Sequence, residues 1–323
     1  MSGRGSPVID GKSRFAPRVA AGPRTNGSGG LIMEHIRNPL EWSWDQLRHT
    51  GRAAESVGRA IGGAREYRHA RPEVRRIGIA DLKDALVRGF SDFGAYRTDV
   101  IFLCLFYPLA GLILARVTFG QDMLPMLFPL ASGFALLGPV AAVGLYEMSR
   151  RRERGLPTNW ADAFKVLGSP SFGAIAVLGL LLMTIFVLWL VAAWIIYQVT
   201  LGPELPASLS AFVKDVFTTN DGWAMIGLGV GVGFLFAALV LTISVVSFPM
   251  LLDRDVGLIT AVRTSIRAAA ANPGAMATWG MIVAGSLVIG SIPLFLGLII
   301  VVPVLGHATW HLYRKLVASE RAF

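Results

Sequence analysis

Two histidines near the end of the chain are the first residues whose type and spacing could do chemistry. His307 and His311 are four residues apart in GHATWHLYRK. On a helix this spacing places both imidazoles on one face, where they could hold a metal ion or a haem. The surrounding Trp310, Tyr313 and Arg314 favour a different interpretation, an anchor at a membrane surface, because aromatic and basic side chains gather there. A weak haem or metal site at His307 and His311 therefore stays open beside the anchor.

Arginines and glycines form two further groups. Arg150, Arg151, Arg152 and Arg154 form a basic cluster, which with Glu147, Asp253, Arg254 and Asp255 suggests ion pairs, a docking surface or a topology signal. The run GLGVGVGF resembles a nucleotide-binding loop, but it lies inside an apolar segment with no strand before it. Its glycines, Gly227, Gly229, Gly231 and Gly233, are instead predicted to pack against another helix.

The elements that carry these residues are apolar enough to cross a membrane. Of the 323 residues, 54% are hydrophobic and 16% are charged. Between Asn272 and Tyr313 there is no Asp, Glu, Lys or Arg. Since a span takes about 20 helical residues, this block predicts a hairpin of two spans, Ala275 to Ile289 and Leu294 to Tyr313. Pro293 lies between them.

The same pattern predicts four earlier spans, and hence an all-α polytopic protein with six transmembrane helices. They begin near Asp99, Met126, Phe172 and Trp223, with a loop holding Glu204, Asp215 and Asp221 before the fourth. Arg and Lys gather in the loop after the second span, in the loop after the fourth and at both termini. The positive-inside rule then predicts a multi-pass protein of the cell inner membrane with both termini in the cytoplasm.

An internal repeat is also expected. A short amphipathic segment precedes each of the three hairpins: DALVRGF from Asp84, DAFKVLG from Asp162 and TAVRTSI from Thr260. Each is predicted to form a cytoplasmic helix at the membrane surface. The first of them, Ile77 to Phe93, is expected to place Ile79, Leu82, Leu86 and Phe90 on one face.

The domain boundaries follow from composition. Residues 1–76 contain fourteen Lys and Arg against seven Asp and Glu, and the first thirty are rich in Gly, Ser and Pro. They predict a basic, largely disordered arm with a possible interfacial helix, which would meet anionic lipid head groups. Translation could also start at Met33. Residues 77–317 form the six-span domain, and residues 318–323 form a short cytoplasmic tail.

Several function classes are disfavoured. A lone cysteine, Cys104, excludes an intramolecular disulfide. The predicted spans carry no ionisable residue at mid-membrane, which argues against an ion-coupled pump, and they show no catalytic grouping. The protein is therefore not expected to be an enzyme or to need a cofactor, and no nucleic-acid motif accompanies its net charge of +9.

Three segments resemble a known family. GLYEMSRRRERG, SFPMLLDRDV and the stretch from NPGAMATWGMIV to PVLGHATWHLYR are similar to uncharacterised prokaryotic integral membrane proteins classed as a domain of unknown function. Some relatives carry a cytochrome c oxidase label. A haem-copper catalytic subunit needs more histidine ligands than His307 and His311, so the resemblance implies an accessory role and no catalytic residues.

The leading functional hypothesis is a non-enzymatic accessory, assembly or scaffold protein. Its partners would be the lipid bilayer and another membrane protein, such as a respiratory complex, or a second copy of itself. The alternative is a transporter for a neutral or amphipathic solute, which would require a polar cavity lined by the hydroxyl side chains of Thr184, Thr242, Ser244, Ser247 and Ser286. Haem or metal handling is the weaker alternative.

Overall fold

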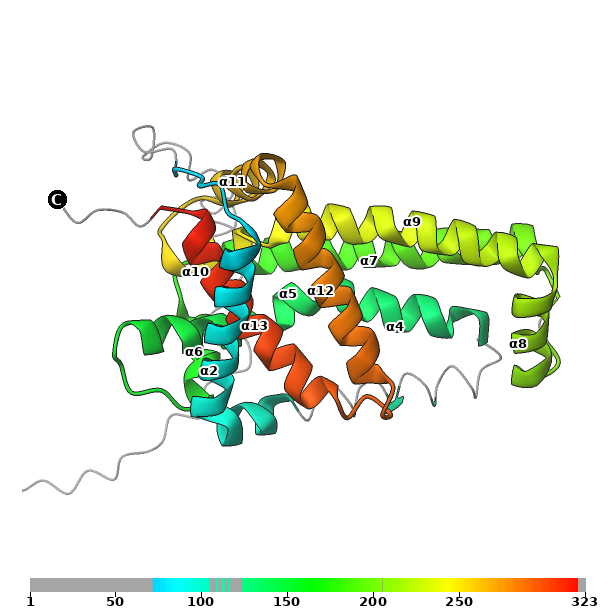
Figure 1. Ribbon diagram of the computed structural model, residues 1–323, viewed down its shortest axis with the longest axis horizontal. Helices are drawn as coiled ribbons and strands as arrows, with labels where there is room; N and C mark the ends of the chain where they lie inside the picture. Colours follow the sequence, from blue (N-terminus) through cyan, green and yellow to red (C-terminus); the bar gives the residue numbers. More distant parts are fainter. Residues whose placement is uncertain are drawn as a thin grey trace, which may run out of the picture. The chain divides into compact units, whose positions relative to one another are not determined.

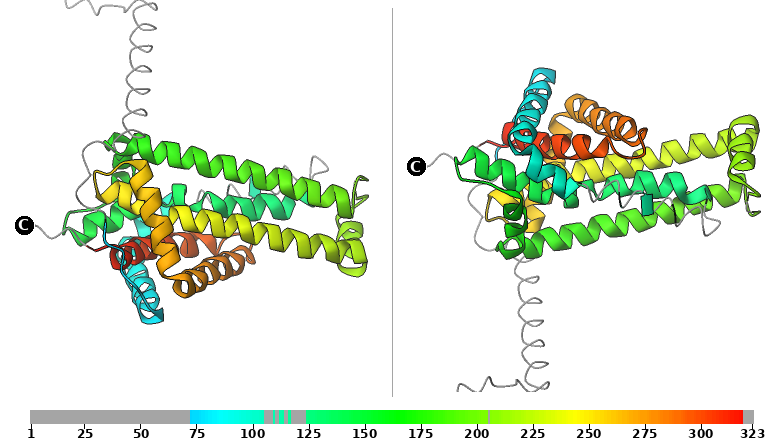
Figure 2. Two further views of the ribbon diagram at one scale, coloured as in Figure 1. Left: turned by 90° about the horizontal axis from the view of Figure 1, so that it is seen from above. Right: turned by 90° about the horizontal axis from the view of Figure 1, so that it is seen from below.

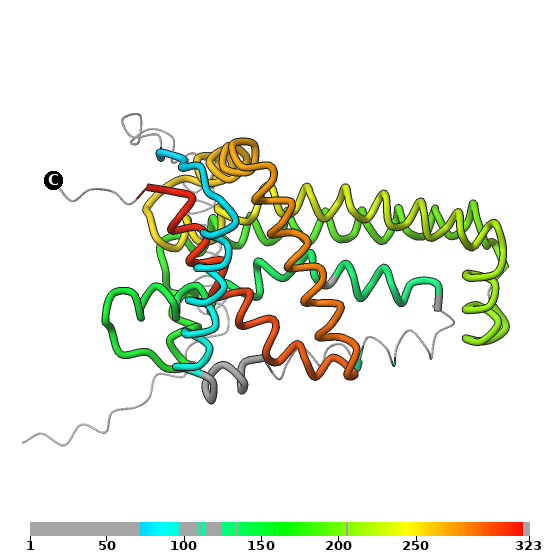
Figure 3. The backbone as a smooth tube through the Cα atoms, in the orientation of Figure 1, coloured from blue at the N-terminus to red at the C-terminus, as the bar shows by residue number. Residues whose placement is uncertain are grey.

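The computed structural model describes residues 72–104, 109, 112–113, 116, 124–204 and 206–318 (Figures 1 and 3). This part of the chain is helical and contains no strand, as expected for an all-α protein. Val74 and Val317 form an isolated antiparallel bridge. Residues 1–71 of the predicted N-terminal arm (Met33 among them), part of the first span and the C-terminal tail beyond residue 318 lie outside the described residues.

Two long apolar helices run side by side, α7 (Phe172–Thr200) and α9 (Asn220–Ser244) (Figures 1 and 2). Both were expected here, because neither sequence interrupts its apolar run with a charge beyond the first turn. The prediction of a loop between them is wrong in part, because this segment contains a helix, α8 (Leu209–Thr218). The Ser208 side chain accepts a hydrogen bond from the Ala211 N–H and so caps α8.

The α9 helix breaks at Val245 and Val246 and continues as α10 (Ser247–Asp253). Residues Ser247 to Leu252 are all buried. The α10 helix ends at the partly buried Asp253, whose side chain is 12% exposed.

The second predicted span is not one continuous helix. It consists of η2 (Leu124–Met126), α4 (Leu127–Leu136), α5 (Gly138–Ala141) and α6 (Val143–Glu153). Gly138 and Pro139 stand at the start of α5, where Pro cannot donate a hydrogen bond to the preceding turn. The arginine run does not follow the helix as expected, because Arg150, Arg151 and Arg152 form the last turn of α6.

The C-terminal hairpin consists of α12 (Pro273–Ser291) and α13 (Leu298–Leu316). The turn between them contains Leu294 and Phe295 with positive φ angles of 52° and 64°. The helices approach closely beside this turn, because a Cβ added to Gly297 would lie 2.7 Å from the Gly290 Cα. Glycine at these two positions permits the tight hairpin.

Helix α2 (Ile79–Cys104) packs against α13, and its backbone departs from helical geometry at Tyr96. The contact uses small residues: Gly89 of α2 lies against Ala308 of α13. The prediction that Ile79, Leu82, Leu86 and Phe90 form one apolar face of α2 is wrong in part. Leu82 is buried, but Ile79 and Phe90 point outward and are 62% and 60% exposed.

The other two amphipathic segments are also helical, η3 (Trp160–Gly168) as a 3₁₀ helix and α11 (Leu258–Ala271) as an α-helix. Asn159 and Asp162 form a capping box at the start of η3. The proposed threefold repeat stays a prediction.

Three helices of the described part are long and apolar enough to cross a membrane: Phe172–Thr200, Asn220–Asp253 and Pro273–Ser291. They coincide with the third, fourth and fifth predicted spans. The prediction of six spans is therefore confirmed only in part.

Candidate functional site

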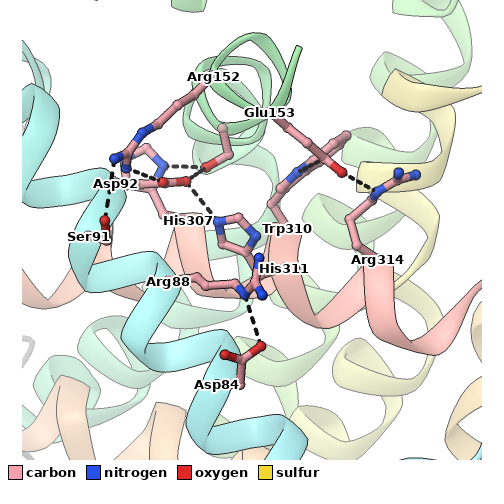
Figure 4. A network of polar contacts seen from close by, with 11 residues as sticks. Asp84, Arg88, Ser91, Asp92, Arg152, Glu153, His307, Trp310, His311 and Arg314 are labelled. Carbon is pink, nitrogen blue, oxygen red and sulfur yellow. Dashed lines mark hydrogen bonds and ion pairs between the residues drawn. The ribbon is translucent and has the colours of Figure 1, made fainter. Parts of the chain in front are cut away.

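A buried polar network joins α2, α6 and α13, with Asp92 of α2 at its centre (Figure 4). The Asp92 carboxylate is 2.6 Å from Ser149 Oγ and 2.9 Å from His311 Nε2, and it forms an ion pair with Arg152. Arg152 also lies 5.9 Å from the centre of the Tyr96 ring, a cation–π contact. Three helices thus meet on one carboxylate.

The hydrogen bonds determine where the protons lie. Burial acts to raise the pKa of Asp92, but hydrogen bonds from His311 and Ser149 outweigh it and hold the pKa below the usual value of 3.8. An ionised Asp92 can only accept, so Ser149 donates to it and His311 donates from Nε2. Ser149 then accepts a hydrogen bond from Nδ1 of His307, 2.7 Å away.

His307 itself is completely enclosed. Its Nε2 atom makes no hydrogen bond of good geometry among the described residues, and the Leu145 carbonyl of α6 acts on the ring through a weaker contact. With Nδ1 protonated, Nε2 carries a lone pair. The proton chain therefore runs from His307 through Ser149 to Asp92.

A second group of contacts surrounds Asp253 at the end of α10. Its carboxylate accepts a 2.9 Å hydrogen bond from the Tyr313 hydroxyl and pairs with Arg314 at 3.2 Å and Arg154 at 3.4 Å. Arg314 also pairs with Glu153 at 3.0 Å, and the other Glu153 oxygen accepts a hydrogen bond from Trp310 Nε1. These contacts join α6, α10 and α13.

A third group lies at the start of α2. Lys315 of α13 is 3.1 Å from Asp81 and 2.9 Å from Asp84, and Asp84 also pairs with Arg88. The Asp81 and Asp84 side chains are 39% and 41% exposed, more than those of Asp92 and Asp253 at 6% and 12%. Hydrogen bonds from Lys315 and Arg88 hold the pKa of Asp84 below its usual value.

The four arginines of the predicted basic cluster all turn inward to partners within the chain. Arg152 pairs with Asp92, and Arg154 pairs with Asp253. Arg150 pairs with Glu147 at 2.8 Å and donates to the Leu252 carbonyl, while Arg151 lies 3.6 Å from Asp162. Of the three interpretations of this cluster, the ion pairs are present in the structure.

The two predicted histidine ligands lie in the same network, and the metal or haem site stays a prediction. His307 is enclosed, and Nε2 of His311 is held by Asp92. Among the described residues, no group of three or more His, Cys, Asp or Glu is placed to hold a metal ion. The surface-anchor interpretation is also wrong for the aromatic residues, because Trp310 and Tyr313 are completely buried.

The predicted glycine group is divided by its surroundings. A Cβ added to Gly233 would meet the Trp189 ring at 3.1 Å, so this glycine packs against α7. Gly227, Gly229 and Gly231 have nothing within 4 Å of an added Cβ. They contribute no packing inside the described part of the chain.

Sequence reasoning did not identify Asp92 or Ser149 as members of a site. A signal was present for Asp92. It follows Leu82, Ala85 and Gly89 at helical spacing, so it is a carboxylate on the face of α2 that is otherwise built of apolar and small residues. No comparable pattern marks Ser149, whose place depends on how α6 packs against α13.

The chemistry of this arrangement is structural. Serine, histidine and aspartate are present, but Ser149 stands between the other two and donates to the carboxylate, so the imidazole does not activate it as a base would. Ser149 is 1% exposed and cannot reach a substrate. The network instead holds three helices together and satisfies their buried polar groups.

Comparison with known proteins agrees with a membrane location. Residues 127–253 match the family model described as "Predicted integral membrane protein (DUF2189)". The match extends from α4 through α10 and so covers α6, α7 and α9. No curated protein and no solved structure matches the chain. The chain is thus a membrane protein by both its family match and its apolar helices.

Proposed function

We propose that this protein is a non-enzymatic accessory, assembly or scaffold partner of another complex in the bacterial inner membrane. A respiratory complex is the first to test, because of the label that some relatives carry. In this proposal the polar network holds the fold together, and the apolar helices bind the partner.

The exposed apolar surface of α9 carries the proposal. In the most apolar 18-residue stretch of the Asn220–Asp253 helix, only 11% of the residues are buried. Leu228, Val230 and Phe234 are 49%, 58% and 69% exposed. Beside them the open positions Gly227 and Gly231 remove side-chain bulk, which allows the backbone of another helix to approach closely. The exposed apolar side chains suit lipid as well as protein, so the small residues Gly227 and Gly231 are what favours a partner helix.

The membrane arrangement that we propose has six spans and cytoplasmic termini. In Figure 1, α2 runs across the direction of α7 and α9, and α12 and α13 cross that direction obliquely. The ion-paired arginines of α6 lie at the same end of α7 and α9 as α11, and α8 lies at the other end. The positive-inside rule assigns the arginine end to the cytoplasm.

The test is recovery of the partner from native membrane with the tagged full chain in mild detergent. The G227I/G231I variant is compared with G285I on α12, because Gly285 also has open space around an added Cβ. We expect wild type and G285I to recover one complex in stoichiometric amounts and G227I/G231I to recover at least about tenfold less, a loss of about 1.4 kcal/mol of binding free energy.

Equal recovery by all three proteins would show that α9 does not bind the partner. Recovery of the chain alone, without a visible absorbance band, would overturn the accessory role and the haem alternative together. Uptake of neutral solutes by reconstituted vesicles would then be measured. Two of the five hydroxyls that would line a transport path already bond to backbone carbonyls four residues earlier in the chain: Thr184 donates to Leu180, and Ser247 of α10 donates to Ile243 of α9.

A further inference from the structure

Helix α11 connects two helices that can cross the membrane. It begins at Leu258, five residues after the Asn220–Asp253 helix ends, and α12 begins at Pro273, two residues after α11 ends. Fourteen helical residues extend about 21 Å. Both ends of α11 are thus tied to the same side of the bilayer, and the helix lies close to the level at which the chain enters the lipid.

Ser265 determines which face of α11 turns outward. Its hydroxyl donates to the Thr242 carbonyl at 2.7 Å and accepts from the Val246 N–H at 3.2 Å, at the break between α9 and α10. Ala261, Ser265 and Ala268 are consequently buried. Because both bonds connect to backbone groups, the rotation of α11 about its axis is set.

The opposite face combines apolar and basic side chains. Ile259 and Ile266 are each 43% exposed, and Arg263 and Arg267 are exposed between and beside them. Neither arginine has an ion-pair partner among the described residues, unlike the arginines of α6. A helix face with large apolar residues and cations is the pattern of a helix lying in the head-group region.

A second segment brings two more cations to the end of α11. Asn272 donates to the Arg75 carbonyl and accepts from the Ile77 N–H, so residues 75–77 are held against the junction of α11 and α12. Arg75 and Arg76 are exposed. The carboxylates nearest to these arginines in sequence are Glu73 and Asp255, both exposed. The four arginines exceed the two carboxylates.

We infer that the outer face of α11, with Arg75 and Arg76, binds the phosphate head groups of anionic lipids in the cytoplasmic leaflet. Ile259 and Ile266 enter the acyl boundary, and Arg263 and Arg267 contact the phosphates. The bilayer is the occupant because the neighbouring spans bring it to this face. Arg75 and Arg76 are the last two residues of the predicted N-terminal arm, and the site is separate from the partner surface of α9.

The test titrates the delipidated full chain in neutral detergent with phosphatidylglycerol or phosphatidylcholine and follows the unfolding temperature. We expect the wild type to be stabilised at lower concentrations of phosphatidylglycerol than of phosphatidylcholine. In R263Q/R267Q the phosphatidylglycerol concentration that gives half of the stabilisation should rise by on the order of tenfold, because each cation near an anionic surface contributes about 1 kcal/mol. This concentration is the midpoint of the titration.

Three controls keep the result decisive. R263K/R267K retains the charges and should behave as wild type, and K214Q removes a cation from α8 and should do the same. R75Q/R76Q tests the site without any change in α11 and should also raise the midpoint. An unchanged midpoint in both glutamine double variants, or equal stabilisation of the wild type by the two lipids, would overturn the inference.

Discussion

Asp92 illustrates how one side chain can determine a helix junction. Its side chain is 6% exposed. The carboxylate accepts hydrogen bonds from Ser149 and His311 and forms an ion pair with Arg152. A buried carboxylate is costly unless it is paired, and here every partner comes from a different helix than its own. The network therefore links the position of α2 to those of α6 and α13.

Replacing Asp92 by asparagine should destabilise the fold by roughly 2–3 kcal/mol. Asparagine keeps the shape but removes the charge that Arg152 faces. The free energy of unfolding would be measured by denaturant titration in detergent. Asp84→Asn on the same helix is the matched control: the Asp84 side chain is 41% exposed, so its loss should cost less than about 1 kcal/mol. Equal effects of the two changes would contradict a special role for Asp92.

The same carboxylate predicts an acid response. The pKa of Asp92 is lowered in the folded protein from its usual 3.8. Such a group stabilises the fold above its unfolded pKa, and this contribution is lost as the pH falls through the lower folded value. The stability difference between wild type and Asp92→Asn should therefore shrink below about pH 4. Unfolding measured from pH 6 down to pH 2.5 tests this, and an undiminished difference at the acid end would be inconsistent with an ionised Asp92.

At the scale of elements, close helix approach depends on a few glycines. A Cβ at Gly89 would lie 2.6 Å from the Ala308 backbone nitrogen, so alanine there must push α2 away from α13. We expect Gly89→Ala to lower the free energy of unfolding by about 1–3 kcal/mol. Gly94→Ala on the same helix meets nothing within 4 Å and should be neutral or stabilising by up to about 1 kcal/mol. Thermal unfolding of both variants checks the pair, and a stable Gly89→Ala protein would refute the close contact.

The elements could be predicted from sequence where one physical signal dominates. The uninterrupted apolar run of α7 predicts Phe172–Thr200 because nothing else competes with it. The break of α4, α5 and α6 was missed, because Pro139 within an apolar run is equally compatible with a bent span. The helix α8 was missed because its charged residues, Lys214 and Asp215, were assigned to a loop together with Glu204 and Asp221, although Ser208 is a recognisable cap.

The candidate site was less predictable because it is made by packing between distant segments. The four-residue spacing of His307 and His311 correctly placed them on one helix, but their partners lie far away in the chain. From sequence alone, Arg150, Arg151, Arg152 and Arg154 were equally compatible with a topology signal and with ion pairs to a group that included Asp253. Only the fold shows that Asp92, from a distant helix, is also one of their carboxylate partners.

On the scale of the whole molecule, polar and apolar residues are separated along α7 and α9. The ion pairs that join α2, α6, α10 and α13 gather at one end of these helices, and large apolar side chains are exposed along their length (Figures 1 and 4). This separation fits a bundle whose polar end holds it together in water and whose sides face lipid or a partner helix.

This arrangement predicts which ends of the helices are accessible from each side of the membrane. In a Cys104→Ser background, which removes the one native thiol, Ala207→Cys places a thiol before α8 and Leu156→Cys places one after α6. Both positions are exposed. A membrane-impermeant maleimide applied to intact spheroplasts should label Ala207→Cys, and it should label Leu156→Cys only after permeabilisation, because the positive-inside rule keeps the arginine end of α6 in the cytoplasm. The reverse pattern would invert the topology and move the lipid-binding face of α11 to the outer leaflet. Labelling of both thiols in intact spheroplasts would mean that α7 does not cross the membrane.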